Sequence, residues 1–389
     1  MHRATALVLI SLLLSSPVVA QTTRAETIAD LQAEKAKNLG TEGPSEAELV
    51  VQRILASPLL NGGDGMYPWF GSVFGGSGMA IGAGYLKRLE KAASINVFGG
   101  ISLNNSILLS TRLAAPALWR GRLRVDVNAT WTDARGVSFY GFGPTSDQSA
   151  RLRYDYQPTD ATSNVAFMPV RWLALSGGYS FVNIETASHR SSEIAGAGPG
   201  LGEGLRYNVT RAGVAIDWRR SPGYSTRGGY YRAEWERHHE TNNFPFSFDS
   251  QEYEVVQVLP FVREQFVLAA RGLMTVTRTE AGHEVPVMLA PYLGSGGTLR
   301  GYTSRRFADR NRLLLTGEYR WRPSRYLDLA LFLDAGQVAP DKHQFRDGDF
   351  ETNWGIGARF HGPRFTAIRV EVARGREGLV LVVGSGQIF

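Results

Sequence analysis

The sequence predicts an all-β protein: a transmembrane antiparallel β-barrel of about sixteen strands with a short N-terminal helical extension. Three observations predict this fold. Apolar and polar residues alternate with a period of two from about Met66 to the end of the chain. Charged residues occupy polar positions in mid-strand, and aromatic residues lie in or near strand ends. The chain also contains 0 Cys, so a closed sheet rather than a set of disulfides would stabilise it.

The first residues have the pattern of a secretory signal peptide. His2 and Arg3 precede an apolar run over residues 6–14, and small residues end at Ala20. The run is too short for a membrane-spanning helix, and no later segment approaches the roughly 18 apolar residues that such a helix needs. We therefore expect residues 1–20 to be a signal peptide that is cut after Ala20, and the mature chain to be exported.

Residues 21–65 read as a short helical periplasmic extension. A first helix is expected over residues 26–37, and a second begins with the capping box Ser45-Glu46-Ala47-Glu48. Apolar residues of the second helix fall on one face. We favour the interpretation that this face packs on a neighbouring surface, and a functional contact in the periplasm is the alternative.

From residue 66 onward, single strands separate an apolar face from a polar one. Over residues 124–131, Arg, Asp, Asn and Thr alternate with Val, Val, Ala and Trp; residues 327–334 and 368–372 alternate in the same way. A soluble β-sandwich would share this alternation, but mid-strand charges and terminal aromatics favour a barrel in lipid. The aromatic residues are Tyr85, Trp119, Trp172, Tyr179, Trp235, Tyr319 and Trp321.

The barrel is expected to cover residues 66–389. Its last strands are predicted at residues 313–321, 327–336, 354–360, 365–374 and 379–389. About sixteen strands fit this length, and about fourteen is the alternative.

A glycine-rich segment with Gly294, Gly296 and Gly297 leads to Leu299-Arg300-Gly301-Tyr302. Two strands later comes Phe332-Leu333-Asp334-Ala335-Gly336, whose alternation puts Phe332, Asp334 and Gly336 on the polar, lumenal face together with Glu318 of the intervening strand. This pattern resembles the BamA/TamA superfamily of outer-membrane barrels, also called the bacterial surface antigen family. The resemblance implies that Arg300, on a loop folded into the lumen, is held by wall carboxylates that include Asp334.

Two further motifs support the resemblance. The segment from Asp217 through Arg219 and Pro222 to Gly228 is similar to the D-x-R-x-x-P…T-R-G-x-Y hairpin of the family. Residues 139–143, Phe-Tyr-Gly-Phe-Gly, resemble its FYGxG motif, and the final Phe389 resembles the C-terminal sorting signal of outer-membrane barrels. The family's protein-folding members usually carry POTRA modules, for which residues 21–65 leave no room. We therefore expect a barrel-only member.

The resemblance implies a protein of the bacterial cell outer membrane that acts in the assembly, insertion or translocation of outer-membrane proteins or lipids. The barrel would open between its first and last strands, where Gly384, Ser385 and Gly386 weaken packing. A passive outer-membrane channel or a structural surface antigen is the alternative. The implied partners are outer-membrane lipids, both lipopolysaccharide and phospholipid, and unfolded outer-membrane proteins or a periplasmic protein; a homodimer is left open and nucleic acid is not expected.

No catalytic residue, cofactor or metal site is predicted, so we expect no enzyme; a lipid hydrolase is the minor alternative. His238-His239-Glu240 has metal-ligand types, but adjacent strand residues point to opposite faces. For Arg300 with Asp334 and Glu318, a structural attachment of the loop is favoured over a moving latch. Four more arginines either line a conduit for anionic clients or are solvated: Arg305, Arg306, Arg310 and Arg312.

Overall fold

The computed structural model describes residues 63–389 except 90–92, 191, 347, 363–364 and 385. Its main element is a single 16-stranded antiparallel sheet, so the predicted all-β class and the predicted strand number are confirmed. The expected signal peptide and almost all of the expected helical extension lie outside the described residues. Within those residues, no helix is long and apolar enough to cross a membrane.

The sheet follows the chain order with one exception: β11 pairs with β14 because β12 and β13 form a small ladder of their own. The elements are β1 (Gly65–Gly71), β2 (Ala80–Leu89), β3 (Ala93–Ser102), β4 (Ile107–Ala117), α4 (Leu118–Gly121), β5 (Leu123–Phe139), η1 (Gln148–Ala150), β6 (Leu152–Val170), β7 (Leu173–Ser188), β8 (Leu205–Asp217), β9 (Gly228–Glu240), β10 (Phe248–Phe261), β11 (Phe266–Thr279), β12 (Tyr292–Leu293), β13 (Phe307–Ala308), β14 (Asn311–Trp321), β15 (Leu327–Ala339), η2 (Lys342–Gln344), β16 (Glu351–His361), β17 (Thr366–Gly375) and β18 (Gly378–Gly384).

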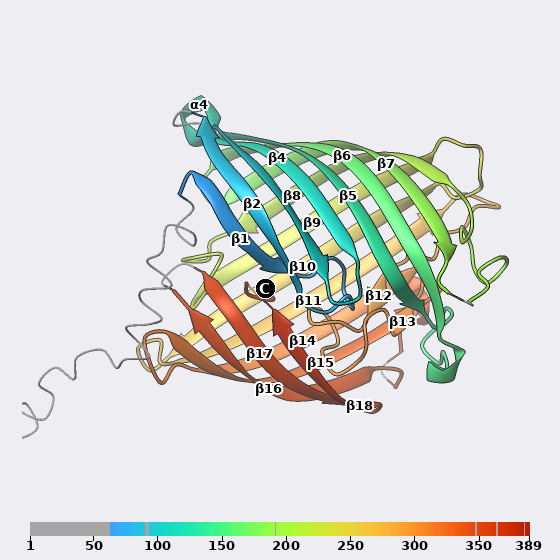
Figure 1. Cartoon of the computed structure of the whole chain (residues 1–389). Helices are drawn as coiled ribbons and strands as arrows, with labels where there is room; N and C mark the ends of the chain where they lie inside the picture. Colours follow the sequence, from blue (N-terminus) through green and yellow to red (C-terminus); the bar gives the residue numbers. More distant parts are fainter. Residues whose placement is uncertain (1–62, 90–92, 191, 347, 363–364, 385) are drawn as a thin grey trace, which may run out of the picture. The chain divides into compact units, whose positions relative to one another are not determined.

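The sheet curls into a barrel whose two edge strands are β1 and β18 (Figure 1). Every ladder joins antiparallel neighbours, and no ladder joins β1 to β18 among the described residues. We call the barrel end that carries Gly71 and Gly375 the loop end, and the opposite end, with Gly65 and Gly384, the turn end. The long segment between β11 and β14, residues 280–310, is called the inward loop, because its central residues are buried in the barrel.

The alternation along each strand has the expected consequence. In β15, Leu329, Leu331 and Leu333 are exposed on the outer surface, whereas Asp328 and Asp334 are buried on the inner one. Successive strand residues point to opposite faces, so a period of two places oily side chains outside and polar ones inside. All seven aromatic residues predicted near strand ends are exposed.

The predicted last strand is wrong at its end. Residues 379–389 were expected to form one strand, but β18 ends at Gly384. The chain then turns inward, and Phe389 packs in the lumen against residues of β10 and β11, namely Val256, Val258, Val267 and Ala269. A glycine with φ +76° at position 386 permits the change of direction.

Candidate functional site

The tip of the inward loop forms a buried ionic cluster with the barrel wall. Arg300 is 1% exposed, and its Nε and Nη2 donate to the two carboxylate oxygens of Asp334 at 2.9 and 2.7 Å. Its Nη1 donates to Glu318 and to Glu371, both at 3.2 Å. The guanidinium also lies over the ring of Phe332, 3.3 Å from its centroid. The planar donor fork suits this arrangement, because it can engage several carboxylates at once.

The cluster contains more charges than the motifs indicate. Arg359 donates to both Glu318 and Glu371, Arg320 donates to Glu318, and Arg369 donates to Glu371 at 2.8 Å. Four guanidinium groups, that of Arg300 included, therefore share three carboxylates in a region closed to solvent. Removing one member of such a set leaves the others buried and unpaired, which costs several kcal/mol.

Glu371 was not among the predicted partners of Arg300. The alternation of residues 368–372 indicates that it faces the lumen, but its separation from Arg300 by 71 residues leaves no pattern that would pair them. Asn353 was also missed, although its Nδ2 donates to Asp334 at 2.8 Å. The structure thus brings Arg300, Glu318 and Asp334 together as expected, and it adds partners from β16 and β17.

The residues beside Arg300 fit the wall closely. A Cβ at Gly301 would lie 2.6 Å from Cβ of Asn353, so only glycine allows this approach. A Cβ at Gly336 would similarly lie 2.9 Å from Leu293. Leu299 and Tyr302 are buried in an apolar cluster whose other members are Leu273, Leu293, Phe307, Leu314 and Val338.

Tyr302 ties the loop to the start of β16. Its hydroxyl donates to Glu351 at 2.7 Å, and burial together with this hydrogen bond raises the pKa of Tyr302 to about 12. The hydroxyl therefore keeps its proton at neutral pH and remains a donor. The site consequently holds the loop by ion pairs, by apolar contacts and by a hydrogen bond from a neutral hydroxyl to a carboxylate.

The FYGxG motif holds the base of the same loop. The hydroxyl of Tyr140 lies 3.1 Å from Thr303 Oγ1, and the guanidinium of Arg306 lies 5.0 Å from the centre of the Tyr140 ring. The amide of Gly143 donates to the carbonyl of Ala308 at 3.0 Å. Phe139 lies beneath, in the apolar cluster of the loop end. Two motifs separated by more than a hundred residues therefore form one attachment.

Three of the four arginines, Arg305, Arg306 and Arg312, form side-chain contacts that attach the inward loop. Arg305 donates to the carbonyls of Val287 and Met288. Arg306 is 3% exposed and pairs with Glu377. Arg312, in β14, pairs with Glu252 at 2.7 Å and donates to the carbonyl of Tyr292 in the inward loop at 3.2 Å. Arg310 is exposed. The sequence suggested that these arginines line a conduit or face solvent. Arg305, Arg306 and Arg312 do neither, because their side chains attach the inward loop to the rest of the barrel.

The D-x-R-x-x-P hairpin lies at the turn end. Arg219 donates to both carboxylate oxygens of Asp217, at 3.0 and 2.9 Å, and Pro222 occupies the turn that follows. Gly228 has φ +113°, and a Cβ there would lie 2.6 Å from Cα of Arg219. The motif therefore specifies a compact turn, which we call the β8–β9 turn (residues 218–227).

The β8–β9 turn reaches the wall made by the last strands. The Tyr224 hydroxyl donates to Asp328 at 2.9 Å, and its ring stacks on His361 with 3.7 Å between centroids. His361 Nε2 lies 3.0 Å from Asp328 as well. Ser225 accepts from Arg320 Nη1 at 3.1 Å, and its amide donates to the side chain of Gln387. The inward loop and the β8–β9 turn are therefore both attached to the same ionic cluster.

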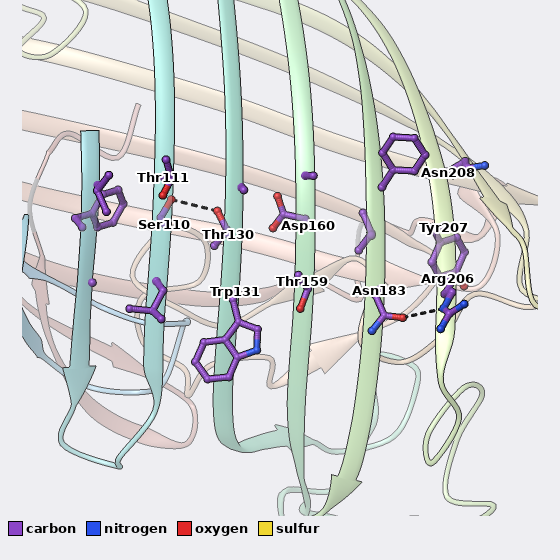
Figure 2. Close-up of a pocket in the computed structure, with 18 of the residues that line it drawn as sticks. Ser110, Thr111, Thr130, Trp131, Thr159, Asp160, Asn183, Arg206, Tyr207 and Asn208 are labelled. Carbon is purple, nitrogen blue, oxygen red and sulfur yellow. Dashed lines mark hydrogen bonds between the residues drawn. The ribbon is translucent and has the colours of Figure 1, made fainter. Parts of the chain in front are cut away.

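A separate pocket of about 780 Å³ lies over β3–β8 and includes none of the predicted site residues. Figure 2 shows it, with Ser110 hydrogen-bonded to Thr130 and Asn183 to Arg206. Its lining is mostly apolar and includes Leu109, Trp131 and Phe181, which are exposed on the outer surface. Among the described residues no group of three or more His, Cys, Asp or Glu could hold a metal ion.

Comparison with known proteins agrees with this geometry. Residues 94–375 match the Omp85 superfamily domain. BamA from Haemophilus ducreyi lacking POTRA domains 1–3 is similar with a TM-score of 0.60 and 13% identity over 82% of this chain and 69% of that one. CdiB from Escherichia coli and CdiB from Acinetobacter baumannii give TM-scores of 0.57 and 0.54 at 12% identity, again over 82% of this chain.

At these identities the structural similarity concerns the fold alone, and this chain spans 62% and 58% of the two CdiB chains, less than two thirds of each. No curated protein matches the sequence. The matched domain nevertheless covers most of the chain, and the sheet that it forms carries the loop and wall motifs in one lumenal site. The chain belongs to the Omp85 superfamily and is a BamA/TamA-like barrel.

Proposed function

We propose that this protein is an outer-membrane barrel that assembles or translocates other outer-membrane components through the seam between β1 and β18. The observation that carries the proposal is the sheet topology: sixteen strands curl into a barrel, yet within the described part of the chain the two edge strands are not paired with each other. A closed barrel satisfies every strand edge, whereas an unpaired edge exposes backbone donors and acceptors that need partners. A polypeptide strand can provide them.

The outer surface supports placement in a membrane. Large apolar side chains are exposed along the whole sheet, and among them Leu331, Leu333, Trp354 and Ile356 are each more than half exposed. An apolar surface that extends around a barrel is far larger than the patches that soluble proteins tolerate. Lipid is the solvent in which such a surface is stable. We assign the loop end to the cell exterior, so that the start of β1 at Gly65 and the end of β18 at Gly384 face the periplasm.

The lengths of the edge strands support the seam as the place of exchange. β1 and β18 have 7 residues each, whereas β6 has 19. A membrane-spanning strand needs about 9–11 residues. We infer that the bilayer thins beside β1 and β18, which would lower the barrier to insertion of a protein or a lipid.

The alternative of a passive channel requires an open lumen, and the packing at the loop end argues against one. Side chains from β5 to β10 and from the inward loop form one buried apolar cluster there, which includes Phe139, Tyr154, Tyr207, Val287 and Met288. We expect small and irregular conductance in planar bilayers. A large, steady conductance would favour the channel.

Seam-locking in proteoliposomes tests the proposed function. The chain has 0 Cys, so cysteine pairs can be introduced without background. Pairs that join β1 to β18 through a bifunctional thiol reagent would hold the seam shut. The readout is the rate at which a urea-unfolded outer-membrane β-barrel folds into the vesicles, and we expect acceleration by the unlocked protein and none by the locked one.

The matched control is a cysteine pair at Val372 and Leu381, which are register partners in β17 and β18. A crosslink there joins two strands that are already paired and leaves the seam free, so acceleration should persist. If the unlocked protein does not accelerate folding, the protein-assembly role is wrong. If it acts equally well with the seam locked, the seam is not the site of exchange.

A further inference from the structure

We propose that two neighbouring hairpin turns at the turn end form a binding surface for anionic phospholipid headgroups. This surface, which we call the basic patch, consists of residues 117–124 around the β4–β5 turn and residues 168–173 around the β6–β7 turn. The inference rests on the membrane placement in the proposed function, but it concerns a surface that the seam does not include. Three observations carry it: unpaired arginines, exposed tryptophans, and the position of the patch beside the outer apolar surface.

The two turns of the basic patch lie side by side. The amide of Met168 donates to the carbonyl of Arg122 at 2.7 Å, and the ring of Trp119 stacks on that of Phe167 with 5.7 Å between centroids. The first turn is α4, which Figure 1 labels at the end of β4. Side chains of both turns therefore share one surface.

The basic patch carries positive charge that no carboxylate of its own balances. Residues 117–124 contain three arginines and residues 168–173 contain one, and neither segment contains Asp or Glu. Arg120, Arg122 and Arg171 are exposed, and their side chains form no ion pair or hydrogen bond within the described part of the chain. A guanidinium without a carboxylate remains available for a phosphate, which its planar donor fork binds well.

Charge is arranged differently at nearby turns and at the other end of the same strands. In the β8–β9 turn, Arg220 pairs with Glu264 at 3.1 Å, so its charge is balanced by the protein. At the loop end, residues 189–204 connect β7 to β8 and contain Arg190 together with Glu193 and Glu203. An excess of unpaired arginine therefore distinguishes the basic patch from these segments.

The basic patch borders the outer apolar surface. Trp119 and Trp172 are 65% and 51% exposed. Phe167, on which Trp119 stacks, is the register partner of Leu175, and Val165 and Leu175 are 44% and 47% exposed on the outside of the barrel. Indole rings favour the depth of lipid headgroups, at the margin of an apolar band. This continuity favours a lipid bilayer over an acidic protein as the partner of the arginines.

The backbone of the first turn indicates that its side chains have a role. Trp119 and Arg120 have φ angles of +47° and +58°, a left-handed conformation that Gly and Asn adopt at lower cost. Residues held in such conformations concentrate at binding sites and other functional positions. The turn therefore keeps a tryptophan and an arginine at two positions where a more permissive residue would fit the backbone better.

A phospholipid with a net negative headgroup fits all three observations. Its phosphate is a partner for the unpaired guanidinium groups, and its acyl chains continue onto the outer apolar surface. Its glycerol region lies at the depth that indole rings favour. In the proposed orientation this lipid belongs to the periplasmic leaflet, and phosphatidylglycerol is a suitable probe for it.

Lipid-selective quenching of a fluorescent label tests the inference. Ala117 is exposed in the basic patch, and the chain has 0 Cys, so Ala117→Cys carries a single label. The labelled protein is reconstituted in phosphatidylcholine vesicles that contain an equal small fraction of brominated phosphatidylglycerol or brominated phosphatidylcholine. Both leaflets have the same composition, so the direction of insertion does not matter. We expect stronger quenching by phosphatidylglycerol, and a preference that decreases as salt screens the charges.

The variant Arg120→Gln with Arg171→Gln removes two charges from the basic patch. The preference for phosphatidylglycerol should fall by about fivefold or more, because each basic side chain near an anionic surface contributes a factor of about that size. Quenching by phosphatidylcholine should remain, which shows that the turn still lies at the membrane. Arg190→Gln with Arg310→Gln removes the same charge from exposed arginines at the loop end and should leave the preference unchanged.

Three results would overturn the inference. Equal quenching by the two lipids would leave the arginines to an acidic protein or to water, and a preference that persists in the patch variant would show that they do not cause it. Displacement of phosphatidylglycerol by added lipopolysaccharide would assign the basic patch to that lipid instead. A label that neither brominated lipid quenches would count against the membrane placement in the proposed function.

Discussion

Arg320 donates from Nη1 to the carbonyl of Ser225, and the same guanidinium donates from Nε to Glu318. Ser225 belongs to the β8–β9 turn, whereas Glu318 binds the tip of the inward loop through Arg300. One side chain thus connects a segment that enters the barrel at the turn end with one that enters at the loop end. Because the cluster is buried, each of these bonds is stronger than it would be in water.

Replacement of Arg320 by Met should therefore loosen the β8–β9 turn. The Ser225 carbonyl loses a bond to a charged donor, which contributes about 1.5–3 kcal/mol. Hydrogen exchange should become faster across residues 221–227. Arg325→Met is the control, because Arg325 is exposed and contacts the neighbouring Tyr326 ring. Unchanged exchange in the turn of the Arg320 variant would show that the other contacts of the turn, those of Tyr224 with Asp328 and of Ser225 with Gln387, are sufficient to hold it.

Arg300→Ala should release the inward loop. Three buried carboxylates lose a shared cation, and breaking a buried pair of this kind costs about 3–5 kcal/mol. The temperature at which the folded barrel is lost on a semi-native gel should fall, and the loop should become sensitive to protease. Arg310→Ala, which alters an exposed arginine of the same loop, should leave both readings unchanged.

Gly228→Ala should destabilise the barrel by about 1–3 kcal/mol, because the residue has φ +113° and the added Cβ would meet the backbone of Arg219. Gly317→Ala is the matched control: it lies in β14, and a Cβ there meets nothing within 4 Å. Chemical denaturation in detergent compares the two. Equal midpoints would contradict the assigned backbone conformation of the turn.

Gly100→Ala should displace Trp69 from its place on β3 and loosen β1. The Cβ would lie 2.5 Å from the indole and 3.0 Å from the carbonyl oxygen of Ile81, and overpacking of this kind costs about 1–3 kcal/mol. Hydrogen exchange in β1 should increase. In Gly272→Ala the nearest atom would be 3.8 Å away, so β1 should exchange as in the parent protein.

Alkaline pH should weaken the Tyr302 attachment. The pKa of Tyr302 is raised from its ordinary value of 10.0 to about 12, so the hydrogen bond to Glu351 is intact below pH 10. Its contribution to stability should be lost as the pH rises from 10 through 12. Tyr302→Phe should remove this part of the stability profile. The measurement is the denaturation midpoint against pH for both proteins; identical profiles would exclude the assignment.

The period of two was sufficient to predict the sheet, because each strand must place oily and polar residues on opposite faces. The end of β18 could not be predicted in this way: Ile388 and Phe389 read as strand residues, but their burial against β10 is a long-range contact. Long-range contacts also explain why the ionic cluster was predicted only in part. Alternation placed Glu318 and Asp334 on the lumenal face, whereas the choice of Glu371 and Arg359 as partners depends on barrel curvature, which no local pattern records.

The interior beside the early strands differs from the packed lumen near the last ones. Arg112 of β4 pairs with Asp126 of β5, and its side chain is 57% exposed, so water reaches this wall. The apolar cluster of the loop end blocks that water from the far side. The wall of the early strands is therefore hydrated and rich in exchangeable polar contacts, whereas the wall of the last strands is a dry ionic attachment for the inward loop.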